Sequence, residues 1–224
     1  MSKLFIDIGN TTVKWLFDGD YQSVSASEFS LDILPNAEQV FVSCVGDASL
    51  LKGLEGMIFA KSCASFNGFK SSYLKPETLG VDRFLAMIGA MHYYPEQDLL
   101  IIDSGSALTF DLVLANGEHQ GGLIAPGLAK LRSSFEQFSN DSQQIILKNI
   151  ASNTEDAWQF GTSQMLMNMI NTQIEQHQES LGGLNIILTG GNAKMIALRT
   201  KHQMQLEQNL ILDGLELYAQ TYLG

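Results

Sequence analysis

The chain has 224 residues, a formal net charge of −11 at pH 7 and a pI near 4.6. This acidic balance argues against a surface for nucleic acid or for an anionic membrane, because either partner requires a basic patch. Hydrophobic residues make up 45% of the chain and charged residues 17%, which is typical of a globular protein with one domain or two small lobes. A small anionic substrate is compatible with this composition, since it needs only a local positive pocket.

The two cysteines, Cys44 and Cys63, are too few for a disulfide scaffold, and no metal-ligand spacing surrounds them. We expect both to be buried thiols. The first apolar stretch contains Asp7 and Lys14, so it does not resemble a signal peptide. No run of about 18 apolar residues predicts a membrane-spanning helix. These features together predict a cytoplasmic protein.

Residues 3–17, KLFIDIGNTTVKWLF, predict a β-hairpin, because two apolar strands flank a turn that begins at Gly9. Asp7 lies within the first apolar strand, where a charge is costly unless something pairs with it. Two interpretations follow: Asp7 caps a tight turn, or it holds a cation next to a phosphate group.

Residues 99–113, LLIIDSGSALTFDLV, repeat the pattern of the first hairpin. In an alignment without gaps, Asp103, Gly105 and Ser106 match the aspartate, glycine and asparagine of the first hairpin 96 residues earlier. This repetition indicates a duplicated domain. We expect an N-terminal lobe at 1–96 and a C-terminal lobe at 97–224.

The remaining elements predicted in chain order are strands and helices in alternation, which favours the α/β class. Ser152 and Glu155 form a capping-box pattern at the start of the longest helix. The segments are a strand at 39–45, a helix at 82–94, a long helix at 152–178, a strand at 184–189, a helix from about 192 and a last helix at 212–222.

Four loops rich in glycine or aspartate could surround phosphates, because backbone amides, hydroxyls and a carboxylate with Mg²⁺ suit that task. No G-x-x-x-x-G-K-[ST] motif occurs, which excludes a P-loop kinase. Each loop alone is more simply a turn, whereas the duplicated pair predicts phosphates held between two facing hairpins. The loops are D-I-G-N-T at 7–11, G-V-D-R at 80–83, D-S-G-S at 103–106 and G-G-N-A at 190–193.

These loops, together with G-G-L-I-A-P-G at 121–127 and N-T at 153–154, occur in an order that resembles the type III pantothenate kinase family. The resemblance spans about residues 4–193. It implies the actin/hexokinase/Hsp70-like fold group, an α/β architecture of duplicated ribonuclease H-like lobes with mixed central sheets flanked by helices. It also implies ATP-dependent phosphorylation of the primary hydroxyl of pantothenate, the first step of coenzyme A biosynthesis.

The resemblance also implies where ATP and the cations bind. Asp7 would organise Mg²⁺, directly or through water, and Asp103 would bind a monovalent cation, K⁺ or NH₄⁺. Ser106 stands where the family usually has an ATP-contacting Thr, a departure that keeps the hydroxyl. The ATP phosphate-binding loop would comprise Asp7, Ile8, Gly9, Asn10, Thr11, Thr12, Val13 and Lys14.

For the substrate, the resemblance implies that Asp82 is the general base and that Arg83 binds pantothenate. Thr154 would close the substrate site from the partner subunit of a homodimer. The substrate-binding residues would be Tyr73, Gly80, Val81, Asp82, Arg83 and Thr154.

Simpler interpretations exist for most of these residues. Asp82 and Arg83 could be an acid at a helix start and a surface salt bridge. Thr154 could belong to a capped helix turn, Tyr73 could be a partly buried aromatic residue, and Lys14 could be solvated. The glycine pair at 190–191 is either a strand-to-helix turn or an adenosine contact. The four histidines show no paired spacing and receive no role: His92, His119, His177 and His202.

Two other functions are open at this point: a non-catalytic regulatory protein of the same fold, and a kinase of another small molecule. The presence of Asp7, Asp82, Arg83 and Asp103 argues against a pure scaffold. Consumption of ATP with and without pantothenate separates these functions.

Overall fold

The computed structural model describes residues 2–138 and 142–221, and it divides the chain into two compact units. The first unit comprises Met1–Glu96, Asn116–His119 and Asn209–Gly224, and the second comprises Gln97–Ala115 and Gln120–Gln208. Each unit contains one five-stranded mixed sheet.

The sheet of the first unit has the order β3-β2-β1-β4-β5. The predicted hairpin is confirmed, since β1 and β2 pair antiparallel, and the predicted strand at 39–45 lies parallel to β1 on its other side. The sequence pattern did not predict β3, which is largely exposed, or β5, which has only three residues. The bounds are β1 Lys3–Ile8, β2 Thr12–Phe17, β3 Asp20–Ser25, β4 Gln39–Cys44 and β5 Met57–Phe59.

Helices α1 (Val81–Tyr93) and α5 (Leu210–Gln220) pack against each other in the first unit. Two glycines allow their backbones to approach closely: a Cβ on Gly214 would lie 2.0 Å from the carbonyl oxygen of Leu85. On the other helix, a Cβ on Gly89 would lie 2.6 Å from the carbonyl oxygen of Leu210. The predicted lobe 97–224 includes α5, whereas in the structure this close contact places the helix with α1 in the first unit.

The sheet of the second unit has the order β10-β9-β8-β11-β12, which repeats the order of the first sheet strand for strand. The central strand of each sheet, β1 or β8, is the one that carries the aspartate shared by the two hairpins. Its hairpin partner lies antiparallel on one side, and a parallel strand lies on the other. The duplication predicted from the hairpins is therefore confirmed. The bounds are β8 Leu99–Ser104, β9 Ala107–Val113, β10 His119–Pro126, β11 Asn185–Thr189 and β12 Gln205–Leu206.

The alignment without gaps holds only for the first strand of each hairpin. Ile8 pairs with Val13 across the first turn, whereas Ser104 pairs with Leu108 across the second. The second turn is therefore one residue shorter, and the strands that follow it shift by one position.

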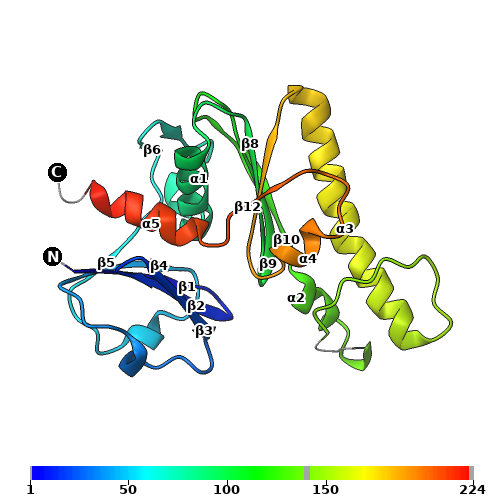
Figure 1. Cartoon of the computed structure of the whole chain (residues 1–224), viewed down its shortest axis with the longest axis horizontal. Coiled ribbons are helices and arrows are strands. Elements are labelled where there is room, and N and C mark those ends of the chain that lie inside the picture. The colour runs from blue at the N-terminus through cyan, green and yellow to red at the C-terminus, as the bar shows by residue number, and fades with distance from the viewer. Residues whose placement is uncertain (1, 139–141, 222–224) are drawn as a thin grey trace. The chain divides into compact units, whose positions relative to one another are not determined.

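The second unit also contains the longest helix, α3 (Thr154–Leu181), which runs alongside the sheet in Figure 1 and packs its apolar side chains on β8, β9 and β11. The predicted capping box is wrong by one residue: Asn153, not Ser152, caps the helix, and its Oδ1 accepts a hydrogen bond of 2.8 Å from the Asp156 amide. Asparagine caps a helix as well as serine does. The helix ends at Leu181, and its C-cap residue Gly182 has a left-handed φ of 69°.

The remaining elements are short. The expected helix from 192 is only one turn long. These elements are α2 Leu128–Arg132, α4 Ala193–Ala197, strands β6 Ser65–Phe66 and β7 Phe69–Lys70, and the 3₁₀ turns η1 Leu31–Ile33, η2 Ala48–Leu51, η3 Pro76–Thr78 and η4 Glu136–Phe138.

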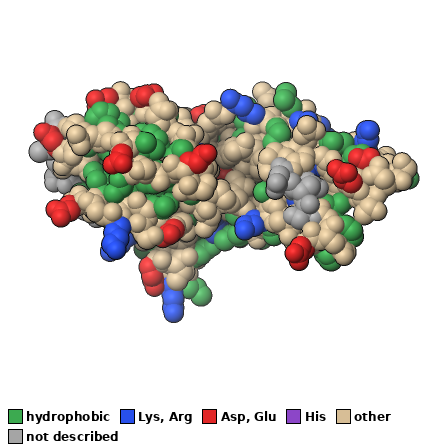
Figure 2. Space-filling view, turned by 90° about the horizontal axis from the view of Figure 1, so that it is seen from below, with side chains coloured by type: hydrophobic (Ala, Val, Ile, Leu, Met, Phe, Trp, Pro, Cys, Tyr) green, Lys and Arg blue, Asp and Glu red, His purple; other side chains and the backbone are tan. Residues whose placement is uncertain are grey.

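The cysteines differ from expectation, since Cys44 and Cys63 are half-buried. Cys44 ends β4, where the strand leaves the core, and Cys63 lies in a loop before β6. Partial burial raises the pKa of both thiols. Among the helices of residues 2–138 and 142–221, none combines the length and the apolar character that crossing a bilayer demands. On the face shown in Figure 2, lysine and arginine side chains stand apart from one another among acidic ones.

Candidate functional site

Asp7 lies near the end of β1 and is only 6% exposed. Its neighbours in the sheet are polar: Ser43 is opposite it on β4, and Lys14 is opposite it on β2. The Ser43 hydroxyl donates a hydrogen bond of 2.9 Å to Asp7 Oδ1. A buried carboxylate is thus supported by one hydroxyl and one neighbouring cation.

The pKa of Asp7 is raised to about 6, chiefly by burial; the negative charge of Asp82 acts in the same direction, while the Ser43 hydrogen bond and Lys14 oppose the shift. A carboxylate whose ionised form is penalised in this way gains stability from an added cation. Asp7 could therefore hold a Mg²⁺ ion, directly or through water. In the part of the chain that the structure describes, no three His, Cys, Asp or Glu side chains gather as a ready-made metal site.

The loop between β1 and β2 exposes Asn10 and Thr11, the two side chains predicted to approach phosphates. The Gly9 amide donates to the Thr12 carbonyl at 3.0 Å and closes the loop. A Cβ on Gly46 would lie 2.2 Å from the Gly9 carbonyl oxygen, so the chain after β4 supports the loop from behind. The side chains of the two remaining apolar loop residues, Ile8 and Val13, lie in the core, so only their backbone groups could contact a ligand.

Helix α1 begins at Val81, and Gly80 is its N-cap residue. The half-buried Asp82 carboxylate accepts a hydrogen bond of 2.8 Å from the Arg83 amide in the first helical turn. A Cβ on Gly80 would lie 2.7 Å from Asp82 Oδ1, so glycine leaves room for this carboxylate. Because Asp82 also raises the pKa of Asp7, the two carboxylates lie within electrostatic reach of each other in the first unit.

Arg83 is 6% exposed, so the interpretation as part of a surface salt bridge is wrong. Its Nη1 donates a hydrogen bond of 2.9 Å to the Tyr73 hydroxyl oxygen. The Tyr73 side chain is half-buried. The structure thus brings together Tyr73 and Arg83, two of the residues predicted to bind substrate.

Asp103 occupies the matching position in the second unit, on β8 between Thr109 of β9 and Thr189 of β11. A Cβ on Gly190, whose φ is 91°, would lie 2.3 Å from Asp103 Oδ1 and 2.7 Å from the Ser104 carbonyl oxygen. The carboxylate therefore lies directly against a backbone position that only glycine fits. Its cross-strand neighbours are both threonines, whereas Asp7 in the first hairpin has Lys14 on one side.

The half-buried Ser106 lies in the turn of the second hairpin, and its carbonyl accepts a hydrogen bond of 3.1 Å from the Gly127 amide. A Cβ on Gly127 would lie 2.2 Å from the Gly105 carbonyl oxygen. Gly127 supports this turn as Gly46 supports the first one. Thr154 is exposed at the first residue of α3.

The first unit therefore contains the predicted phosphate loop, Tyr73 and the segment 80–83, and the second unit contains Asp103, Ser106 and Thr154. Sequence reasoning missed Ser43, although a hydroxyl within the apolar run QVFVSCV is a usable signal. It also gave no role to His119, which contacts Tyr73.

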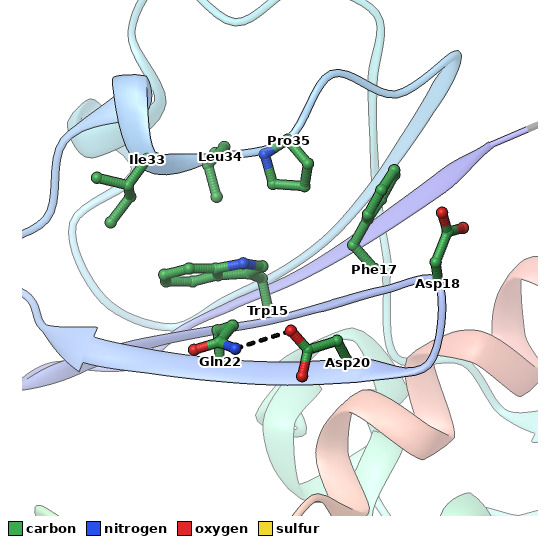
Figure 3. Close-up of a pocket in the computed structure, with 8 residues that line it drawn as sticks. All are labelled: Trp15, Phe17, Asp18, Asp20, Gln22, Ile33, Leu34 and Pro35. Carbon is green, nitrogen blue, oxygen red and sulfur yellow. Dashed lines mark hydrogen bonds between the residues drawn. The ribbon is translucent and has the colours of Figure 1, made fainter.

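A cavity of about 490 Å³ lies elsewhere in the first unit, between the sheet and the segment 33–35 (Figure 3). In the figure, the Trp15 and Phe17 rings face Ile33, Leu34 and Pro35. None of the predicted site residues lines this cavity. The lining residues are Trp15, Phe17, Asp18, Asp20, Gln22, Ile33, Leu34 and Pro35.

Comparison with known proteins identifies the family. A family model described as type III pantothenate kinase matches residues 3–176. A type III pantothenate kinase of Colwellia psychrerythraea is 34% identical, over 96% of this chain and 99% of the relative.

Among solved structures, a Campylobacter jejuni protein described as a conserved Baf family transcriptional activator has a TM-score of 0.67 at 23% identity, with 98% of each chain covered. The activator of 2-hydroxyisocaproyl-CoA dehydratase from Clostridium difficile, with bound ADPNP, has a TM-score of 0.52 at 13% identity, with 99% of this chain and 95% of that chain covered. These structures show the fold, which is that of the actin/hexokinase/Hsp70-like ATPases. The family model and the identity to the Colwellia relative establish that the chain belongs to the type III pantothenate kinase family.

Proposed function

We propose that the chain transfers the γ-phosphate of ATP to the primary hydroxyl of pantothenate, with Asp82 as the general base. Kinase activity toward pantothenate follows from membership of the family. The assignment of roles to residues rests chiefly on one observation: the Asp7 carboxylate is buried near the end of β1, accepts a hydrogen bond from Ser43 and lies within electrostatic reach of Asp82.

The hairpin loop at 9–12 would bind the phosphates of ATP, with Asn10 and Thr11 as hydrogen-bonding side chains. Asp7 would hold Mg²⁺ directly or through water, and the bound metal would neutralise charge on the phosphates. Lys14, opposite Asp7 in the sheet, would add a positive charge on the same side. Phosphoryl transfer requires mainly positioning and charge neutralisation, which these residues can provide.

Asp82 would accept the proton of the pantothenate hydroxyl as that oxygen attacks the γ-phosphate. Its hydrogen bond from the Arg83 amide fixes the carboxylate at the start of α1. A positioned general base contributes about 10²–10⁴-fold to a rate.

Arg83 would bind the carboxylate of pantothenate. The planar guanidinium can donate two parallel hydrogen bonds, which the ammonium group of lysine does not reproduce. Its burial and its bond to Tyr73 hold the guanidinium in one orientation.

Asp103 would bind the monovalent cation, K⁺ or NH₄⁺, against the backbone of Gly190, and Ser106 would contact ATP. Thr154 would reach the pantothenate site of a partner subunit, since we propose a homodimer. The cytoplasmic location expected from the sequence is part of the same proposal.

A coupled assay of ADP formation tests the function. ADP should appear with pantothenate and not with an analogue that lacks the primary hydroxyl. ATP consumption that ignores pantothenate would indicate a kinase of another substrate, and no ATP consumption would indicate a regulatory protein.

A further inference from the structure

His119 is the first residue of β10, and it is only 2% exposed. It belongs to the turn 116–119, which is part of the first unit although the strands on either side lie mainly in the second. No spacing or motif in the sequence provides a reason to assign this histidine a role. Its surroundings in the structure do.

The His119 ring stacks with two aromatic rings. Its centroid lies 5.9 Å from that of Phe69 and 5.9 Å from that of Tyr73, with interplanar angles of 29° and 16°. Its Nδ1 also lies 3.4 Å from the Ser72 hydroxyl oxygen. Offset stacks at these separations are attractive beyond the area that they bury.

Tyr73 depends on such contacts because residues 71–75 form neither a helix nor a strand. The Tyr73 hydroxyl accepts the 2.9 Å hydrogen bond from Arg83. The Arg83 guanidinium carbon is 5.8 Å from the ring centroid, near the outer limit for cation–π attraction, so the hydrogen bond is the dominant contact. A tilted or displaced ring would lose this bond.

The turn that carries His119 is itself fixed to the first unit. The Lys70 amide donates a hydrogen bond of 2.9 Å to the Gly117 carbonyl. Gly117 has a φ of 81°, and a Cβ there would lie 2.1 Å from the Gly68 carbonyl oxygen. Two glycine-containing turns thus meet backbone to backbone, and this contact sets the position of the imidazole.

We infer that His119 is a positioning residue for pantothenate binding: its ring holds Tyr73 in the orientation in which the Tyr73 hydroxyl accepts the hydrogen bond from Arg83. This inference rests on the proposed function, in which Arg83 and Tyr73 bind pantothenate. The aromatic stack from Phe69 to Tyr73 links the core of the first unit to the substrate-binding arginine.

The test compares His119→Phe, which keeps an aromatic ring, with His119→Gln, which keeps a polar side chain and loses the stack. The KM for pantothenate should rise several-fold to about tenfold in His119→Gln, the range expected for a lost aromatic contact. The KM for ATP and the kcat should stay within about twofold of the wild-type values. His119→Phe should restore most of the affinity for pantothenate.

His92→Ala is the matched control, because His92 is an exposed histidine on α1 of the same unit, and it should change none of these constants. An equal rise of both KM values in His119→Gln, or no rise in either, would overturn the inference. So would a His119→Phe variant as impaired as His119→Gln.

Tyr73→Phe and Arg83→Lys separate this inference from the proposed function. If both variants raise the KM for pantothenate while His119→Gln does not, only the role of His119 is wrong. If neither variant changes that KM, the assignment of Tyr73 and Arg83 to the substrate is wrong, and the inference falls with it.

Discussion

Ser43 donates a hydrogen bond of 2.9 Å to Asp7 from the position directly opposite it on β4. This bond opposes the effect of burial on the Asp7 carboxylate, because it favours the ionised form. The second unit has a hydroxyl residue at the matching place, since Thr189 is opposite Asp103 on β11. Both halves of the duplicated fold thus put a hydroxyl residue beside the aspartate of the hairpin.

Replacing Ser43 with alanine should lower the free energy of unfolding at pH 8 by about 1.5–3 kcal/mol, the usual contribution of a hydrogen bond to a charged group. It should also raise the pKa of Asp7 and weaken Mg·ATP binding near pH 6. Urea unfolding measures the change in the free energy of unfolding, and ATP titrations measure the change in Mg·ATP binding. Ser30→Ala is the control, because its hydroxyl contacts Asp32 on the exposed surface, where water can replace it. Equal effects of the two substitutions would contradict a special role for Ser43.

The stability of the protein should depend on pH through Asp7. Burial raises the pKa of this carboxyl from its ordinary value of 3.8 to about 6, so between these values the folded state retains a proton that the unfolded state releases. The bound proton stabilises the folded state fully below about pH 4, and this stabilisation is lost as the pH rises through about 6. The loss lowers the free energy of unfolding by roughly 3 kcal/mol.

The measurement is the free energy of unfolding in urea from pH 4 to pH 8, for the wild type and for Asp7→Asn. The asparagine resembles the protonated acid but cannot ionise. The wild type should therefore lose stability relative to Asp7→Asn as the pH rises from 4 to 8. A difference that stays constant with pH would mean that Asp7 titrates normally.

Asp82→Asn should reduce turnover by at least about two orders of magnitude while ATP still binds. It should also lower the pKa of Asp7, because a negative charge nearby is removed. Steady-state kinetics measure the turnover, and titration with a fluorescent ATP analogue measures ATP binding. Asp32→Asn, at an exposed site of the same unit, should behave as the wild type. Near-normal turnover in Asp82→Asn would remove this residue from the mechanism.

Gly190→Ala should destabilise the protein by about 1–3 kcal/mol and reduce activation by K⁺. The new Cβ would meet Asp103 Oδ1 at 2.3 Å in a left-handed backbone conformation. Gly191→Ala is a matched control next to it, since a Cβ there meets no atom within 4 Å. Thermal unfolding measures the stability of the two variants, and reaction rates in K⁺ and in Na⁺ measure their activation. Equal stability and equal activation in both variants would count against a cation site at Asp103.

Asp103→Asn should abolish the difference between rates in K⁺ and in Na⁺, because a neutral amide attracts a monovalent cation more weakly than a carboxylate does. The KM for pantothenate should change less than the KM for ATP. A variant that still prefers K⁺ would show that the cation binds elsewhere.

Much of the fold could be predicted because the central strands carry strong apolar patterns around an aspartate. The hairpins at 3–17 and 99–113 are the clearest case, and α1 was predicted within one residue at each end. The strands β3, β5 and β12 escaped prediction because they are polar or very short, so periodicity gives no signal.

The candidate site was predictable where a motif was local, as in residues 80–83. A contact of the site was not predictable where one of its two residues comes from a distant segment of the chain. Ser43 reaches Asp7 through strand pairing, and His119 reaches Tyr73 through a turn fixed by two glycines. The packing of α5 on α1 likewise depends on a close contact between Gly214 and Leu85 that no periodicity reveals.

That contact at Gly214 has a consequence for fragments and deletions of this gene product. The first unit consists of three separate segments of the chain, the last of which contains α5. It can therefore fold completely only after α5 has been synthesised. A nonsense mutation shortly before Leu210 would leave the amino-terminal hairpin encoded yet strip α1 of the helix that covers it. A fragment that ends near residue 96 would lack both α5 and the turn 116–119, so the first unit could be completed only by supplying those segments in trans.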